Sequence, residues 1–209
     1  RVDITCWEKV GVEERGAFFD GIGALRDVGQ NHLLQILALI SMEQPQDYGA
    51  EAVRAKRREV LQTIKIPTPE EVRHDTFRAQ YEGYHSIAGV APGSQTETYF
   101  KVRAFLDAPR WNGVPFTFEW GKRMGEALRE IVVTFKHPSP CMCPPTEREH
   151  FQNRVVFRLE PEEGITIAFW SKKPGLEMVM EERDFTFSYR PPVERGQHTD
   201  EYEKLLFDC

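Results

Sequence analysis

The sequence has no apolar run long enough to cross a membrane. Its longest run, LLQILALI at residues 33–40, is interrupted by Gln35 and falls well short of the roughly 20 apolar residues that a spanning helix needs. It also has no initiator methionine and no basic segment leading into an apolar one, so we expect no signal peptide. A chain that opens on Arg1 is interpreted as a segment of a longer protein.

An excess of basic charge is also lacking. The formal net charge is -6, whereas a phosphate backbone is normally bound by a basic face. The local run RAKRR at residues 54–58 lies among helix formers and is interpreted as a solvated helix face. We therefore predict no nucleic-acid partner.

The four cysteines do not make up a complete zinc-binding set. Cys141 and Cys143 lie in PSPCMCPP, at a spacing shorter than C-x-x-C, and no second pair accompanies them. Because His137 and His150 flank the pair, a metal site stays open as the less favoured alternative to a proline-rich loop with reduced thiols. We predict no metal, and reduced thiols favour a cytoplasmic location.

No G-x-G-x-x-G follows a strand pattern, so the sequence has no recognisable dinucleotide cradle. Residues 1–8 alternate as a strand, and residues 16–43 and 49–64 have helical patterns. Runs rich in Val, Phe, Tyr and Thr indicate seven further strands, at 75–84, 96–107, 114–122, 130–136, 153–161, 164–173 and 182–190. This order predicts an α+β fold with a large, mainly antiparallel sheet and helices packed on one face, in a single domain of residues 1–209.

The first long helix is predicted to carry a histidine in its apolar stripe. At about 100° per residue, His32 falls between Val28 and Ile36. Asp27 lies about 140° away on the polar side, so any carboxylate that orients His32 is expected from another segment. A glycine inside a helix costs about 1 kcal/mol relative to alanine, so Gly29 predicts the close approach of another group to the backbone.

Two interpretations of His32 stay open on these grounds. The residue is either a core histidine whose ring nitrogens bind backbone carbonyls, or a general base. A half-buried imidazole is suited to the second role because it can exchange a proton near neutral pH.

Several longer motifs occur in a fixed order along the chain. They are ERGAFFDGIGALRDVGQNHLLQILALISMEQP, RAQYEGY, TETYF, RWNGVPF followed by Gly121 and Lys122, EIVVTFK, SKKPG and DEYEKLLFDC. In these motifs the sequence resembles the glucose-6-phosphate dehydrogenase family, the NADP-dependent first enzymes of the pentose phosphate pathway, over essentially the whole chain.

The resemblance implies the family's C-terminal substrate-binding and dimerisation domain, without the N-terminal Rossmann domain that binds NADP. The implied reaction oxidises glucose 6-phosphate to 6-phosphoglucono-lactone. By motif match, His32 is the general base, Glu8 and Asp27 bind sugar hydroxyls, and Lys122 binds the sugar-phosphate end. The aspartate that partners His32 is expected from the missing domain, so the chain alone is expected to be inactive.

Four positions depart from the family pattern. Ala127 stands where the family usually has a second Arg or Lys, and Glu160 stands where some members have glutamine. Both put phosphate affinity in doubt and keep open a non-catalytic sugar-phosphate-binding or dimerisation module. Glu119 and Leu128 replace basic residues that some members use for a second, structural NADP, so we do not predict that site.

Aromatic side chains on the predicted wetter face of the sheet are more than two or three helices can cover. We therefore predict a homodimer formed through the sheet. The residues concerned are Tyr99, Phe105, Phe157, Phe169, Phe185 and Phe187.

Overall fold

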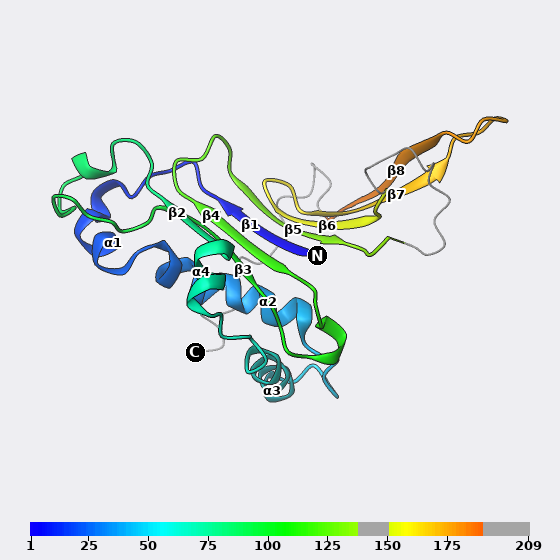
Figure 1. Cartoon of the computed structure of the whole chain (residues 1–209), viewed down its shortest axis with the longest axis horizontal. Coiled ribbons are helices and arrows are strands. Elements are labelled where there is room, and N and C mark those ends of the chain that lie inside the picture. Colours follow the sequence, from blue (N-terminus) through cyan, green and yellow to red (C-terminus); the bar gives the residue numbers. More distant parts are fainter. Residues whose placement is uncertain (138–150, 190–209) are drawn as a thin grey trace.

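The computed structural model describes residues 1–137 and 151–189, whose strands form one sheet (Figure 1). The strand order across the sheet is β2-β3-β4-β1-β5-β6-β7-β8. The strands are β1 (Val2–Trp7), β2 (Thr76–Ala79), β3 (Tyr99–Ala104), β4 (Phe116–Gly121), β5 (Leu128–Thr134), β6 (Arg154–Glu160), β7 (Gly164–Lys172) and β8 (Met180–Ser188). Neighbouring strands are antiparallel except β1 and β4, which are parallel. The predicted α+β fold with a mainly antiparallel sheet is confirmed.

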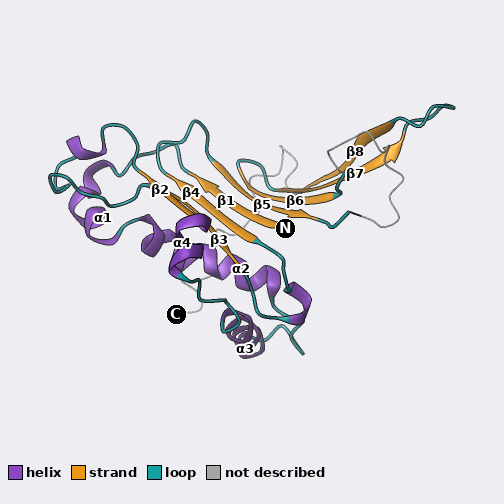
Figure 2. Cartoon of the chain, in the orientation of Figure 1, coloured by secondary structure: helices purple, strands orange, loops and turns teal. Residues whose placement is uncertain are grey.

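The helices lie on one side of the sheet, against the half that contains β1 to β4 (Figure 2). Most of them belong to the first third of the chain, as the sequence patterns predict. They are η1 (Glu13–Arg15), α1 (Gly16–Ile22), η2 (Leu25–Leu33), α2 (Leu34–Ser41), α3 (Ala50–Leu61), α4 (Pro69–Asp75), η3 (Tyr84–Ser86) and η4 (Pro109–Trp111). Of these, η2 is a π-helix and the other η elements are short 3₁₀ turns.

The short helix α4 was not predicted, although the sequence carries its start signal. The Thr68 hydroxyl accepts a hydrogen bond from the Glu71 backbone N–H at 3.3 Å, and the Glu71 carboxylate accepts one from the Thr68 backbone N–H at 2.7 Å. This reciprocal arrangement is a capping box, which the spacing T-x-x-E at residues 68–71 could have indicated.

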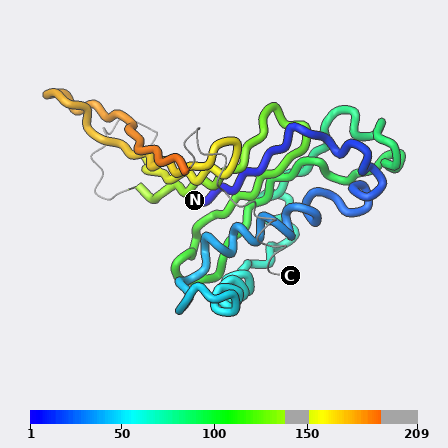
Figure 3. The backbone as a smooth tube through the Cα atoms, turned by 180° about the vertical axis from the view of Figure 1, so that it is seen from behind, coloured from blue at the N-terminus to red at the C-terminus, as the bar shows by residue number. Residues whose placement is uncertain are grey.

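The core lies between the η2–α2 segment and the middle of the sheet. Viewed from behind, this segment runs along β3 and β4 (Figure 3). It buries Leu33 and Leu37 among the rings of Phe100 and Phe118, which project from the facing strands. A fully buried leucine side chain contributes roughly 1.5–3 kcal/mol relative to an exposed one, so this contact fixes η2 on the sheet.

The face of the sheet that packs on the helices continues beyond them. Residues directly opposite each other on adjacent strands point to the same side, and one such row runs Phe118, Ile4, Ile131, Phe157, Ile165 and Phe187. Phe118 is buried at one end of this row, whereas Phe187 is 61% exposed at the other.

The assignment of the aromatic residues to a wetter face was therefore wrong for four of them. Phe157, Phe169, Phe185 and Phe187 lie on the helix side of the sheet, beyond the area that the helices cover, because the apolar face is longer than its helical cover. Tyr99 does lie on the opposite face. Its direct partner on β4 is Gly121, which alternates with Phe118 and Trp120 and so shares the face of Glu119.

Candidate functional site

Two of the predicted site residues meet where β1 and β4 end. Parallel neighbours end at the same edge of a sheet, so Glu8, which follows β1, and Lys122, which follows β4, lie side by side. The Lys122 Nζ atom is 2.6 Å from the Glu8 Oε2 atom, and it also lies 5.4 Å from the centre of the Trp120 ring. The Glu8 backbone N–H donates to the Gly121 carbonyl at 2.9 Å, which fixes the pair against the strand end.

The other two predicted site residues lie on η2, and here the helical-wheel prediction was wrong. His32 is exposed instead of lying in the apolar stripe, while Gly29 and Leu33 are the buried residues of this helix. The reason is that η2 is a π-helix, with backbone bonds between residues five apart. Such residues lie one turn apart on roughly the same side of the helix. Asp27 and His32 therefore share one side, contrary to the expected separation.

The exposure of His32 contradicts one of its two interpretations, the core histidine. A core histidine satisfied by backbone carbonyls would be buried, which His32 is not. Across residues 1–137 and 151–189, no hydrogen bond or ion pair involves the His32 ring or the Asp27 carboxylate. Their polar atoms are therefore available to an incoming ligand.

Gly29 fulfils its prediction. A Cβ atom added at Gly29 would lie 3.1 Å from the Phe100 Cζ atom and 3.1 Å from the Leu25 Cδ1 atom. The Phe100 ring in turn stacks on Trp120 at 6.2 Å, beside Lys122. The glycine thus lets the π-helix sit directly on the aromatic layer that also supports the Glu8–Lys122 pair.

The charge of Glu160 raised a doubt about phosphate affinity, and a contact that was not predicted reduces this doubt. The Glu160 carboxylate accepts a hydrogen bond from the Arg129 Nη1 atom at 2.9 Å, so its negative charge is paired. Arg129 lies directly opposite Cys6, on the helix side of the sheet. Cys6 is two residues before Glu8 in the chain. Burial raises the pKa of the Cys6 thiol, and the charge of Arg129 partly opposes this shift.

A loop approaches the start of α1, the first α-helix after β1. The first helix after β1 begins at Gly16, where an added Cβ atom would lie 2.2 Å from the Ala88 carbonyl oxygen. Any side chain at this position would therefore collide with the loop, which accounts for the glycine.

An apolar cavity of about 410 Å³ lies on a different side of η2. Its walls come from η2, α2, α4 and β3 and include Leu25, Leu34, Phe100 and Val102, but none of the four predicted site residues. In the described part of the chain, no group of three or more metal-ligating side chains is present, and no helix is long and apolar enough to span a bilayer. Cys141, Cys143 and His150 fall outside these residues, so the alternative of a metal site there lies outside the described structure.

The model of the family described as glucose-6-phosphate dehydrogenase, C-terminal domain, matches residues 1–209. The chain is 38% identical over 221 residues to the glucose-6-phosphate 1-dehydrogenase of Aggregatibacter actinomycetemcomitans, covering 100% of this chain and 43% of the relative. For the protein of the same name from Gluconobacter oxydans, the identity is 40% over 223 residues, covering 100% of this chain and 44% of the relative.

Solved structures agree with these sequence relatives. Glucose-6-phosphate 1-dehydrogenase from Mycobacterium avium matches with a TM-score of 0.82 at 34% identity, over 99% of this chain and 43% of that one. A glucose-6-phosphate dehydrogenase in complex with its substrate glucose-6-phosphate matches with a TM-score of 0.79 at 30% identity, over 90% of this chain and 39% of that one. The chain spans less than half the length of these relatives, and it belongs to the family of glucose-6-phosphate dehydrogenase C-terminal domains.

Proposed function

We propose that this chain forms the sugar-phosphate half of a glucose-6-phosphate dehydrogenase active site, in which glucose 6-phosphate is oxidised at C1 to 6-phosphoglucono-lactone. The Glu8–Lys122 pair supports this function, because a carboxylate accepts hydrogen bonds from sugar hydroxyls and an ammonium group attracts phosphate. One observation carries the proposal: the π-helix η2 presents Asp27 and His32 on one side, with His32 exposed.

His32 is the general base of the proposed reaction. Its imidazole accepts the proton of the C1 hydroxyl while the hydrogen bound to C1 leaves as hydride. The C1–O bond then becomes the carbonyl of the lactone. A positioned base of this kind contributes on the order of 100- to 10,000-fold in rate. Asp27 and Glu8 accept hydrogen bonds from sugar hydroxyls, and Lys122 binds the sugar-phosphate end.

NADP, bound mainly by the N-terminal Rossmann domain that this family implies, supplies the hydride acceptor. We assign no cofactor contact to this chain. The chain by itself is accordingly inactive in this proposal.

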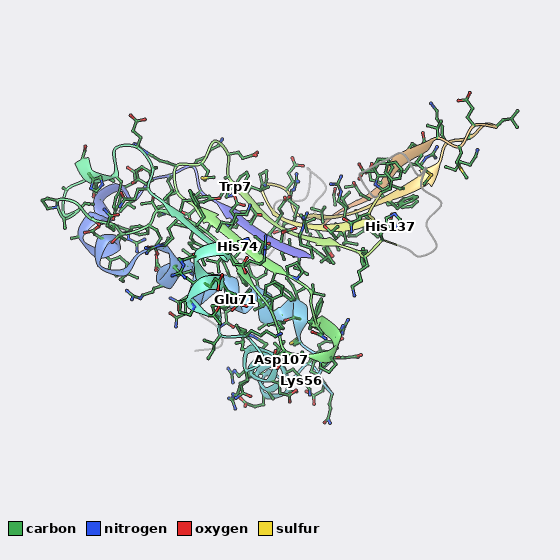
Figure 4. All side chains as sticks on the ribbon, viewed as in Figure 1. Trp7, Lys56, Glu71, His74, Asp107 and His137 are labelled. Carbon is green, nitrogen blue, oxygen red and sulfur yellow. The ribbon has the colours of Figure 1, made fainter. Side chains whose placement is uncertain are left out.

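The general base is tested in a complete chain, in which this region follows an NADP-binding domain. His32→Gln is expected to lower kcat for NADP reduction by at least about 100-fold. His74→Gln is the matched control, since His74 lies on α4 (Figure 4), is exposed, and has its Nδ1 atom 3.0 Å from the Asp75 carboxylate. The control is expected to keep kcat within about twofold.

Near-normal turnover by His32→Gln would remove His32 from the base role. Calorimetry with glucose 6-phosphate and with glucose tests the alternative of a non-catalytic module. The proposed site binds glucose 6-phosphate more tightly than glucose, whereas binding that ignores the phosphate contradicts the assignment of Lys122.

We further propose that residues 1–209 act as one substrate-binding and dimerisation domain in the cytoplasm, forming a homodimer through the sheet. The unpaired thiol of Cys6 supports a reducing compartment. The exposed rings of Phe185 and Phe187 support self-association, because a contiguous apolar surface of this kind is usually covered by a partner. Sedimentation at micromolar concentration is expected to show a dimer that Phe185→Ser with Phe187→Ser dissociates and that Tyr48→Ser, an exposed loop control, does not.

A further inference from the structure

Glu97 is a buried carboxylate that the proposed reaction does not use. It is only 8% exposed and immediately precedes the buried residue Thr98. Its Oε1 atom accepts a hydrogen bond from the Leu25 backbone N–H at 2.9 Å, and its carbonyl oxygen accepts one from the Ala24 backbone N–H at 3.2 Å. Its Oε2 atom lies 3.6 Å from the Arg78 guanidinium. Glu97 therefore holds the first residues of the π-helix η2.

The start of η2 needs such an outside partner. The first N–H groups of a helix have no acceptor within it, and the capping residue Ala24 has no side chain that could accept a bond. A carboxylate is the most favourable acceptor there because the N-terminal end of a helix carries partial positive charge. Glu97, two residues before β3, thus supplies the acceptor that the helix's own sequence lacks.

Gly23 makes this approach possible. Its φ angle is +79°, a conformation that favours glycine, and an added Cβ atom would lie 2.9 Å from the Glu97 Oε1 atom. The turn that leads into η2 is therefore shaped around the Glu97 carboxylate.

The next residue holds the other half of the site. The Thr98 carbonyl oxygen accepts a hydrogen bond from the Lys122 backbone N–H at 3.0 Å. Thr98 is itself fixed by its backbone N–H, which donates to the Ala79 carbonyl at 3.0 Å, and by its hydroxyl, which accepts from the Tyr81 backbone N–H at 2.9 Å. Two consecutive residues therefore hold both the π-helix and the Glu8–Lys122 pair.

We propose that Glu97 is a positioning residue, which sets the π-helix that carries Asp27 and His32 at a fixed distance from the Glu8–Lys122 pair. The proposal rests on the proposed function of these four residues. Glu97 itself does not touch the sugar. Its removal lets η2 shift relative to Lys122, so the base loses its alignment with the C1 hydroxyl while the sugar-phosphate contacts persist.

The test compares Glu97→Ala with Glu119→Ala in the complete chain. Glu119 is the matched control because it is also a mostly buried carboxylate with a basic partner, Lys101 at 2.9 Å, but it lies on the other face of the sheet. Glu97→Ala is expected to lower kcat by at least about tenfold with KM for glucose 6-phosphate changed less than about threefold, since misalignment of a base costs turnover more than binding. Glu119→Ala is expected to leave both within about twofold.

A second readout does not depend on activity. In NMR spectra of the same proteins, Glu97→Ala is expected to shift the His32 ring signals and to speed hydrogen exchange at the Leu25 amide, whereas Glu119→Ala changes neither. Glu97→Gln keeps an acceptor oxygen and is expected to restore most of kcat. If Glu97→Ala does not fold, Glu97→Asp withdraws the acceptor by one methylene and is expected to lower kcat in the same way.

Unchanged kcat and unchanged His32 and Leu25 signals in Glu97→Ala or Glu97→Asp would overturn the positioning role. An unaffected His32→Gln enzyme would instead reject the proposed general base, and in that case the NMR shifts alone would still report whether Glu97 holds η2. The two failures are thereby distinguishable.

Discussion

The two ends of the sheet present the same apolar face in opposite states. At the end covered by helices, Phe100 and Phe116 are fully buried, whereas on β8 the rings of Phe185 and Phe187 are 69% and 61% exposed. The direct cross-strand partners place these residues on one continuous face. The difference shows that alternation along a strand specifies which side is apolar, while the length of the helical cover decides how much of that side is core.

Truncating one ring at each end is the strongest way to break this comparison. Phe100→Ala is expected to lower the free energy of unfolding by about 3–5 kcal/mol, because it removes the ring that supports Gly29 and stacks on Trp120. Phe187→Ala is expected to change it by less than about 0.5 kcal/mol, since the ring is largely in water. Urea unfolding of the two variants measures both values, and equal losses would mean that the face near β8 is also core.

Gly29→Ala sharpens the comparison at the contact that covers the sheet. The added methyl group would meet Phe100 and Leu25 at 3.1 Å each, so overpacking is expected to cost about 1–3 kcal/mol in unfolding free energy. Gly21→Ala on α1 is the control, because no atom lies within 4 Å of its added Cβ, and it is expected to be neutral or stabilising by about 0.4–1 kcal/mol. A harmless Gly29→Ala would show that η2 does not depend on this close approach.

Asp20 on α1 and Asp184 on β8 allow the stability of the two ends to be compared as a function of pH. Hydrogen bonds from the Ser94 hydroxyl and the Ala91 backbone N–H lower the pKa of Asp20 below 3.8, its ordinary value. Its ionised form therefore stabilises the fold above about pH 3.8, and this contribution is lost as the pH falls through the lowered pKa. Asp20→Asn is expected to cost about 1 kcal/mol at neutral pH and less in acid.

The control for Asp20 lies at the uncovered end of the sheet. Asp184 on β8 is exposed and accepts one hydrogen bond, from the Thr186 hydroxyl at 3.1 Å. Asp184→Asn is expected to change unfolding free energy by less than about 0.5 kcal/mol at either pH. Unfolding curves recorded at pH 7 and pH 3 measure the contrast, and a difference for Asp20→Asn that does not shrink in acid would argue against the charged hydrogen bonds as its cause.

Much of the fold could be predicted from the sequence, because strand alternation and helical periodicity are local. The strands, the two main helical segments and the close approach at Gly29 all follow from such local patterns. The π-helix could not be predicted in this way. This helix contacts Glu97 and Phe100, which are distant in sequence, and a wheel of regular period placed His32 on the wrong side.

The site shows the same limit. Family motifs indicated Glu8 and Lys122, and their contact follows from the parallel pairing of β1 and β4, which no local pattern reveals. The partner of Glu160 was missed for a related reason. A strand bulge at residues 129 and 130 sets the register between β5 and β6, and this register alone brings Arg129 to Glu160.

The smallest expected effect concerns this Arg129–Glu160 pair. It is compared with a similar ion pair at the other end of the sheet. Each partner is nearly half exposed, so the pair contributes at most about 1 kcal/mol to stability. In the proposed function its larger consequence is for phosphate binding, because Glu160 neutralises a cation on the helix side of the sheet, one strand from Glu8. Glu160→Gln keeps the size of the side chain and removes its charge. It is expected to lower KM for glucose 6-phosphate about two- to fivefold in a complete chain, most strongly at low salt.

Glu182→Gln is the matched control at the other end of the sheet, since Glu182 pairs with Arg154 at 2.7 Å and is similarly exposed. If the effect were a general gain of positive charge, both variants would lower KM alike, because a long-range field depends little on position. If instead Arg129 acts locally, only Glu160→Gln changes KM, and KM for glucose, which has no phosphate, stays constant. Steady-state kinetics with the two sugars at two salt concentrations separate these cases. Equal behaviour of the two variants would contradict a local contribution of Arg129 to phosphate binding.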